Sequence, residues 1–100
     1  MIYLTALMFI KEGKEDVFKE YESSVLPILK DYKGKLIYRI RPRKEDFIEF
    51  EGERPFELHF ISFPSNEDFI NFTKDDKRNS FVNLKEDAIK TSFIVKGETI

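Results

Sequence analysis

The chain has 100 residues, of which 41% are hydrophobic and 36% are charged, and its formal net charge is -2. Because so short a chain buries only one core, residues 1–100 are expected to form a single domain, and the near-neutral charge argues against nucleic acid or an anionic membrane surface as a partner. With no cysteine and 1 histidine, the sequence holds neither a disulfide framework nor the usual zinc ligand sets, so we expect no metal, no cofactor and a cytoplasmic location.

The first predicted strand covers residues 2–10, IYLTALMFI, an almost unbroken apolar run. Its β-branched and aromatic residues favour a strand that is covered on both faces, so we place it in the middle of a sheet. The run is too short to cross a membrane and has neither a basic leader nor a cleavage site, so neither a signal peptide nor a transmembrane span is expected.

A first helix of roughly five turns is predicted over residues 15–32. Pro27 removes one backbone donor and is expected to kink this helix, and Gly34 is expected to end it in a left-handed conformation. The acidic residues 15, 16, 20 and 22 are interpreted as a solvated face. The apolar residues at helical spacing are Val17, Phe18, Tyr21, Val25, Ile28, Leu29 and Tyr32.

Residues 35–43 and 54–64 alternate between apolar and polar side chains and predict the second and third strands. Residues 44–54 between them, with the turn signal Glu51-Gly52, predict a hairpin arm whose register the sequence does not fix. The expected helix-facing residues of these two strands are Leu36, Tyr38, Ile40, Phe56, Leu58 and Phe60.

A second helix is predicted to begin after Ser65, since Asp68 three residues later completes an approximate capping box. Helical spacing is interrupted at residues 75–80 and resumes over 81–89, and residues 91–97 predict a fourth strand. The order β-α-β-β-α-β predicts an α+β, ferredoxin-like sandwich: an antiparallel four-stranded sheet in the order 4-1-3-2 with both helices on one face.

Helices on one face leave the other sheet face open, and large apolar side chains fall on it. Each one left exposed forgoes about 1.5–3 kcal/mol, and together they approach the whole stability of a small domain. We therefore expect a homodimer, a dimeric α/β barrel in which two sheets stack around a cleft.

This cleft is the predicted ligand site, because apolar walls with a few convergent polar groups are typical of small-molecule pockets. Guanidinium groups suit a carboxylate or phosphate, and an imidazole suits general base catalysis. The predicted polar groups are Arg39, Arg41, Glu57 and His59, with His59 as the catalytic candidate, and the predicted walls are Ile37, Ile61 and Phe63.

Each of these residues also has a structural interpretation. This interpretation is the favoured one: His59 would pair with a neighbouring carboxylate, and Arg39, Arg41 and Arg43 would form cross-strand ion pairs, with Arg39 as the best functional candidate among them. An open sheet with aromatic residues would also suit RNA, but the third strand lacks the glycine-flanked aromatic signature of RNA-binding sheets.

Two stretches resemble a known family: residues 21–39, YESSVLPILKDYKGKLIYR, and residues 51–72, EGERPFELHFISFPSNEDFINF. The chain is similar to a family of small uncharacterised dimeric α/β-barrel proteins related to the antibiotic-biosynthesis-type monooxygenases. This resemblance implies a two-fold dimer and, for the monooxygenase branch, cofactor-free chemistry on aromatic or polyketide-like substrates. The matching positions are Tyr21, Pro27, Tyr32, Gly34, Arg39, Glu51, Gly52, Pro55, Phe63, Pro64 and Ser65.

Three functions remain open at this point. The first is a dimeric module that binds a small organic anion or an aromatic molecule. The second is a cofactor-free enzyme, monooxygenase-like or isomerase-like, that uses the same cleft. The third is a structural dimer whose cleft is filled by its own side chains.

Overall fold

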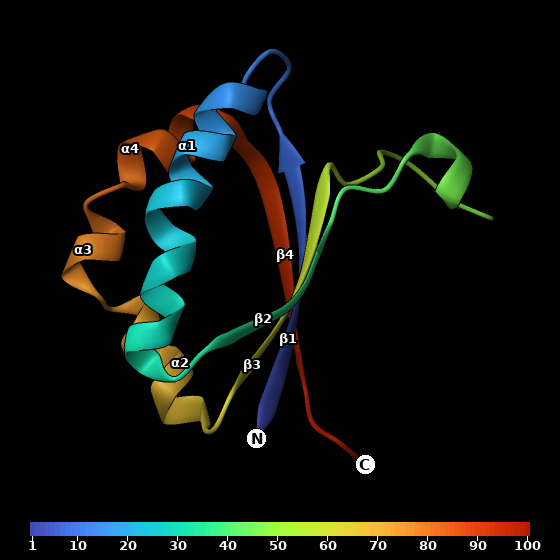
Figure 1. Ribbon diagram of the computed structural model, residues 1–100. Helices are drawn as coiled ribbons and strands as arrows, with labels where there is room; N and C mark the ends of the chain where they lie inside the picture. The colour runs from blue at the N-terminus through green and yellow to red at the C-terminus, as the bar shows by residue number, and fades with distance from the viewer.

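The computed structural model describes residues 1–100 as an antiparallel four-stranded sheet with the helices on one face (Figure 1). The strands lie in the order β2-β3-β1-β4, which is the predicted order 4-1-3-2 counted from the other edge. The predicted ferredoxin-like α+β fold is therefore confirmed. The strands are β1 (Ile2–Ile10), β2 (Lys35–Ile40), β3 (Glu57–Phe63) and β4 (Ile89–Gly97).

The first helix changes type where the kink is predicted. α1 (Glu15–Val25) is followed directly by the 3-10 helix η1 (Leu26–Tyr32), and Pro27 lies in the first turn of η1. The backbone N–H of Leu26 still donates to the carbonyl oxygen of Glu22, but Pro27 has no N–H with which to continue this α-helical pattern. The predicted position of the irregularity at Pro27 therefore coincides with a change from an α-helix to the narrower 3-10 helix.

Lys33, and not Gly34, ends this helix in the left-handed conformation, with φ of 62°. Gly34 serves the packing instead. A Cβ atom at Gly34 would lie 2.8 Å from the ring of Phe63 and 3.0 Å from the carbonyl oxygen of Leu29. Only glycine therefore lets the end of η1 approach β3 this closely.

The second helical region is divided into three short helices, α2 (Asn66–Thr73), α3 (Asp76–Asn79) and α4 (Val82–Ala88). Ser65 caps α2 as predicted, because its Oγ accepts a hydrogen bond of 3.2 Å from the backbone N–H of Asp68. The predicted interruption at residues 75–80 contains α3, whose cap is Asp75. No helix of the chain is long and apolar enough to span a bilayer.

The facing of β2 differs from the prediction after Leu36 because β2 contains a bulge, and the facing of β3 is the reverse of the predicted one. Leu36 pairs with Ile61, but Tyr38 pairs with Phe60, so Ile37 is an extra residue on β2. One extra residue reverses the facing of every residue after it. Leu36 and Phe56 pack toward the helices as predicted, whereas the prediction was wrong for Tyr38, Ile40, Leu58 and Phe60, which lie on the open face.

The core lies between the sheet and α1, η1 and α2. Alternate residues of β1 face it, and from β3 it receives Ile61 and Phe63, which are 9% and 1% exposed. Their predicted place as walls of a cleft between two sheets was therefore wrong. The buried residues of β1 are Ile2, Leu4, Ala6 and Met8.

Residues 41–56, which we call the connecting arm, join β2 to β3. They contain the 3-10 turn η2 (Lys44–Asp46) and no strand, so β2 and β3 pair as a hairpin, but the arm between them does not extend it with strands of its own. The connecting arm projects on the side of the sheet opposite the helices (Figure 1). It exposes Ile48 and Phe50 to 99% and 49%.

Candidate functional site

A cluster of charged side chains lies between the sheet and α1. Glu57 and His59 belong to β3, Glu22 belongs to α1, and Arg39 and Arg41 come from the end of β2. Glu57, Glu22 and His59 are 0%, 2% and 6% exposed. The four predicted polar groups therefore do converge, but on the helix side of the sheet, and their predicted position in a cleft between two sheets was wrong. We call these five residues the charged cluster.

Both carboxylates of the charged cluster approach the same nitrogen of His59. Nε2 lies 2.5 Å from Oε2 of Glu57 and 2.7 Å from Oε2 of Glu22. A single N–H cannot donate well to both atoms, and the hydrogen bond of the ring goes to Glu57. Oε2 of Glu22 is left without a hydrogen bond from the protein.

Two arginines hold the carboxylates in place. Arg39 donates from Nη2 to Oε1 of Glu22 at 2.9 Å and from Nε to Oε2 of Glu57 at 3.3 Å. Arg41 donates from Nε to Oε1 of Glu57 at 2.6 Å. Arg43 lies outside the charged cluster, and its Nη2 is 3.2 Å from Oδ1 of Asp46. Each of these three arginines is therefore paired with a carboxylate, as expected if its role is structural.

The carboxylates of the charged cluster differ in acidity. Burial raises the pKa of Glu22 and outweighs the opposing hydrogen bond with His59. Burial also raises the pKa of Glu57, but hydrogen bonds with His59 and Glu22 outweigh it, so this pKa falls well below its ordinary value. Burial lowers the pKa of His59, but hydrogen bonds to both glutamates outweigh it and raise the pKa to about 9. His59 is therefore protonated at neutral pH.

The charged cluster carries net positive charge. Two guanidinium groups and one imidazolium face two carboxylates, and the raised pKa of Glu22 weakens the negative side further. Glu22, Glu57 and His59 each offer a metal-ligand atom, all within 4.8 Å of one another. However, the arginines occupy the carboxylate oxygens and repel a cation, so the arrangement favours anion binding and proton transfer over metal binding.

A cavity of ≈ 100 Å³ adjoins the charged cluster on the helix side of the sheet. We call it the chamber. Its polar lining comes from Glu22, His59, Tyr21 and Arg78, and the rest is apolar and comes from β1, β3, α1, η1, α2 and β4. This volume is below the about 150 Å³ of an apolar cavity that holds benzene, so a ligand of one ring would fill the chamber and extend through its partly open side.

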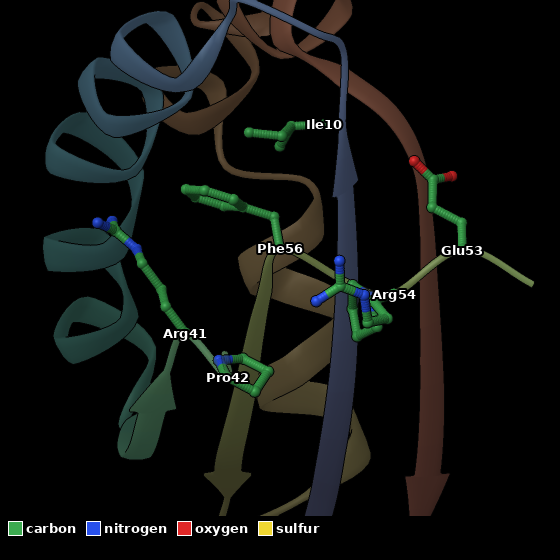
Figure 2. A pocket seen from close by; sticks show the side chains of 7 residues that line it. Ile10, Arg41, Pro42, Glu53, Arg54 and Phe56 are labelled. Carbon is green, nitrogen blue, oxygen red and sulfur yellow. The ribbon is translucent and has the colours of Figure 1, made fainter. Parts of the chain in front are cut away.

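A second, more open pocket of ≈ 400 Å³ lies where β2 ends and β3 begins. Figure 2 shows Arg41 and Phe56 pointing toward α1, while Glu53 lies over β4. Glu53 is bound to Lys90 of β4 at 3.0 Å, and the guanidinium group of Arg41 lies 5.2 Å from the ring centre of Phe56. Because Arg41 also binds Glu57, this outer pocket reaches the charged cluster from outside.

Comparison with solved structures shows the same fold in several bacterial proteins. A protein of unknown function from Rhodopseudomonas palustris is 14% identical, with a TM-score of 0.82 over 99% of this chain and 82% of that one. A dimeric protein of unknown function and ferredoxin-like fold from Bacteroides fragilis is 10% identical, with a TM-score of 0.71 over 98% of this chain and 95% of that one. A candidate antibiotic biosynthesis monooxygenase from Nitrosomonas europaea is 10% identical, with a TM-score of 0.74 over 100% of this chain and 99% of that one.

The predicted resemblance is confirmed in the fold. At 10–14% identity these structures establish the architecture and leave the activity open. No protein-family model matches the sequence, and no curated protein matches it either.

Two residues of the site were missed in the sequence. Glu22 was interpreted as part of a solvated helix face, but it is four residues after Phe18 and three before Val25, and both of these are buried. That spacing places Glu22 on the apolar side of α1 and is a signal for its burial. Arg78 has no such signal, because it lies in the interrupted part of the second helical region.

Proposed function

We propose that this protein is a homodimer in which each protomer binds a small organic anion or aromatic molecule in the chamber. The observation that carries the proposal is a charged cluster with net positive charge, in which Glu22, Glu57 and His59 are buried, beside a cavity with apolar walls. Apolar walls bind the carbon skeleton of a ligand, and convergent polar groups fix its orientation. We thus place the ligand site in the interior of each protomer and not in the predicted cleft between two sheets.

An anion is favoured because charge interactions are strong where water is excluded. Arg39 and His59 lie next to each other across β2 and β3, and both bind the same two carboxylates. The excess positive charge would attract a carboxylate bound anywhere in the adjoining chamber, because the effective dielectric constant of a buried region is low. A cationic ligand would be repelled by the same groups.

The open face of the sheet supports the homodimer. Tyr38, Phe93 and Val95 are 64%, 58% and 61% exposed there, and the rings of Tyr3 and Phe60 stack at 5.4 Å beside them. Covering each such residue contributes about 1.5–3 kcal/mol, so a second sheet stacked on this face stabilises both chains. The connecting arm lies on this side, where it would contact the second protomer (Figure 1). The similar protein from Bacteroides fragilis is described as dimeric.

A cofactor-free enzyme is the second candidate, and the unequal carboxylates favour it. A carboxylate with a raised pKa that faces a cavity is suited to general acid–base catalysis near neutral pH. Glu22 would take a proton from a carbon next to a carbonyl group, the electron pair of that C–H bond would form a C=C bond, and the π pair of the carbonyl group would move to its oxygen. Return of the proton to another carbon completes an isomerisation without a co-reactant. A monooxygenase-like reaction is suggested by the similar Nitrosomonas europaea protein and would require dioxygen.

Ligand-observed NMR with benzoate as the probe tests the binding proposal. His59→Gln and Arg43→Gln each remove one positive charge, but only His59 belongs to the charged cluster. We expect His59→Gln to weaken benzoate binding about tenfold and Arg43→Gln to leave it unchanged. Equal effects of the two substitutions would contradict the proposal. Absence of benzoate binding to the wild type would instead favour the structural dimer.

Glu22→Gln separates the binding module from the enzyme, with Glu20→Gln on the exposed side of α1 as the matched control. In a turnover screen, loss of kcat with ligand binding retained in Glu22→Gln alone indicates catalysis. If Glu22→Gln leaves kcat unchanged, or if the wild type shows no turnover, the binding module is supported.

A further inference from the structure

Two buried side-chain atoms receive no hydrogen bond of their own from the protein: Nε of Arg78, and Oε2 of Glu22, which lies 2.7 Å from Nε2 of His59 while the N–H of that nitrogen is directed to Glu57. Both residues line the chamber. Native proteins pair nearly all buried polar atoms, because an unpaired one loses its hydrogen bonds to water without replacement. The coincidence of both atoms at one cavity therefore indicates that the chamber is built for a polar occupant.

The side chain of Arg78 is held in place while its Nε–H remains free. Its guanidinium carbon lies 4.9 Å from the ring centre of Phe72, and Nη1 donates at 3.3 Å to the carbonyl oxygen of Thr73 and at 3.3 Å to Oδ1 of Asn79. Neither acceptor is a carboxylate, so these bonds leave the positive charge of Arg78 without an anionic partner. Arg78 can therefore bind an anionic oxygen without breaking an ion pair.

The other polar end of the chamber is formed by Glu22 and His59. Tyr21 also lines the chamber, and burial raises the pKa of its hydroxyl group. Between the ends the lining is apolar, with Val25 of α1 among its members. The chamber thus combines a cationic donor, an unpaired carboxylate oxygen and an apolar wall.

We infer that the occupant of the chamber is a small hydroxylated carboxylate, whose carboxylate group accepts the Nε–H of Arg78 and whose hydroxyl group binds Oε2 of Glu22. A hydroxyl group both donates and accepts hydrogen bonds, so it satisfies Glu22 in either protonation state. The volume of ≈ 100 Å³ restricts the carbon skeleton to about one ring. This inference rests on the proposed function and assigns the ligand class of the same site.

Three probes of similar size separate the two contacts in the wild-type protein. Para-hydroxybenzoate has both groups, benzoate lacks the hydroxyl group, and phenol lacks the carboxylate. We expect para-hydroxybenzoate to bind at least about tenfold more tightly than either of the others, measured by NMR titration. If phenol or benzoate binds as tightly as para-hydroxybenzoate, the inference is overturned, although the chamber would remain a binding site.

Arg78→Lys keeps the positive charge but removes the Nε–H. We expect it to weaken para-hydroxybenzoate and benzoate about tenfold and to leave phenol unchanged, an effect that a merely loosened structure would not produce. Lys77→Gln on the same short helix is the control, since Lys77 is exposed and does not line the chamber. If Arg78→Lys changes all three affinities equally or changes none, the inference is overturned. If no probe binds to the wild type at millimolar concentration, the proposed function itself fails.

Discussion

The pH dependence of stability should report directly on the charged cluster. In the folded protein the pKa of His59 is raised from its ordinary 6.5 to about 9 by Glu22 and Glu57, which outweigh the effect of burial. A group whose pKa is raised by folding stabilises the folded state fully below its unfolded pKa. This stabilisation is lost as the pH rises through the folded pKa.

The size of the effect follows from the two pKa values. At about 1.4 kcal/mol per pKa unit, the shift of His59 corresponds to at most about 3 kcal/mol of stability. The free energy of unfolding should therefore decrease between about pH 6.5 and about pH 9 and level off above that range. The neighbouring carboxylates share the same nitrogen, so part of the loss is offset when they rearrange around the neutral ring.

Urea unfolding followed by circular dichroism measures this decrease, at a fixed protein concentration so that any dimerisation contributes equally. His59→Gln should be less stable than the wild type at neutral pH and should lack the decrease. Arg43→Gln should retain it, since Arg43 is paired with Asp46 outside the charged cluster. A wild-type curve that is flat over this range, or a decrease that persists in His59→Gln, would refute the assignment.

Three further substitutions test other parts of the structure. Phe93→Lys on the open face should convert the proposed dimer to a monomer, as measured by sedimentation, while the control Asn83→Lys on α4 should not. A dimer that persists in Phe93→Lys would contradict the proposed interface. Gly34→Ala places a methyl group 2.8 Å from the ring of Phe63 and should lower the unfolding free energy by about 1–3 kcal/mol, and an unchanged urea midpoint would disprove the close packing. Ser65→Ala removes the cap of α2 and should cost about 0.5–2 kcal/mol in the same assay, so an equal stability would mean that the cap does not contribute.

The order of elements could be predicted from the sequence because its signals are local. The apolar run of β1, the proline in η1 and the cap at Ser65 each act within a few residues, and the structure contains all three features. The strand order follows from these elements through the handedness of β-α-β connections. The connecting arm lacked such a signal, since its turn residues do not lead into paired strands.

The facing of the strands could not be predicted because it depends on one bulge. The two sides of β3 are almost equally apolar in sequence, and Ile37 decides which side of β2 is buried. The burial of Glu22 and Glu57 depends on partners that are distant in the sequence, chiefly Arg39. Charged residues become stable in a core only when such partners are present, so local periodicity indicates which side of α1 Glu22 occupies, but the partners that permit its burial follow only from the assembled fold.

A crystal structure of the protein grown with para-hydroxybenzoate would show directly whether the chamber is the binding site. We expect the ring to lie in the chamber, with its carboxylate group within hydrogen-bond distance of Nε of Arg78 and its hydroxyl group next to Oε2 of Glu22. A probe bound only between the open sheet faces, with water alone in the chamber, would contradict this assignment.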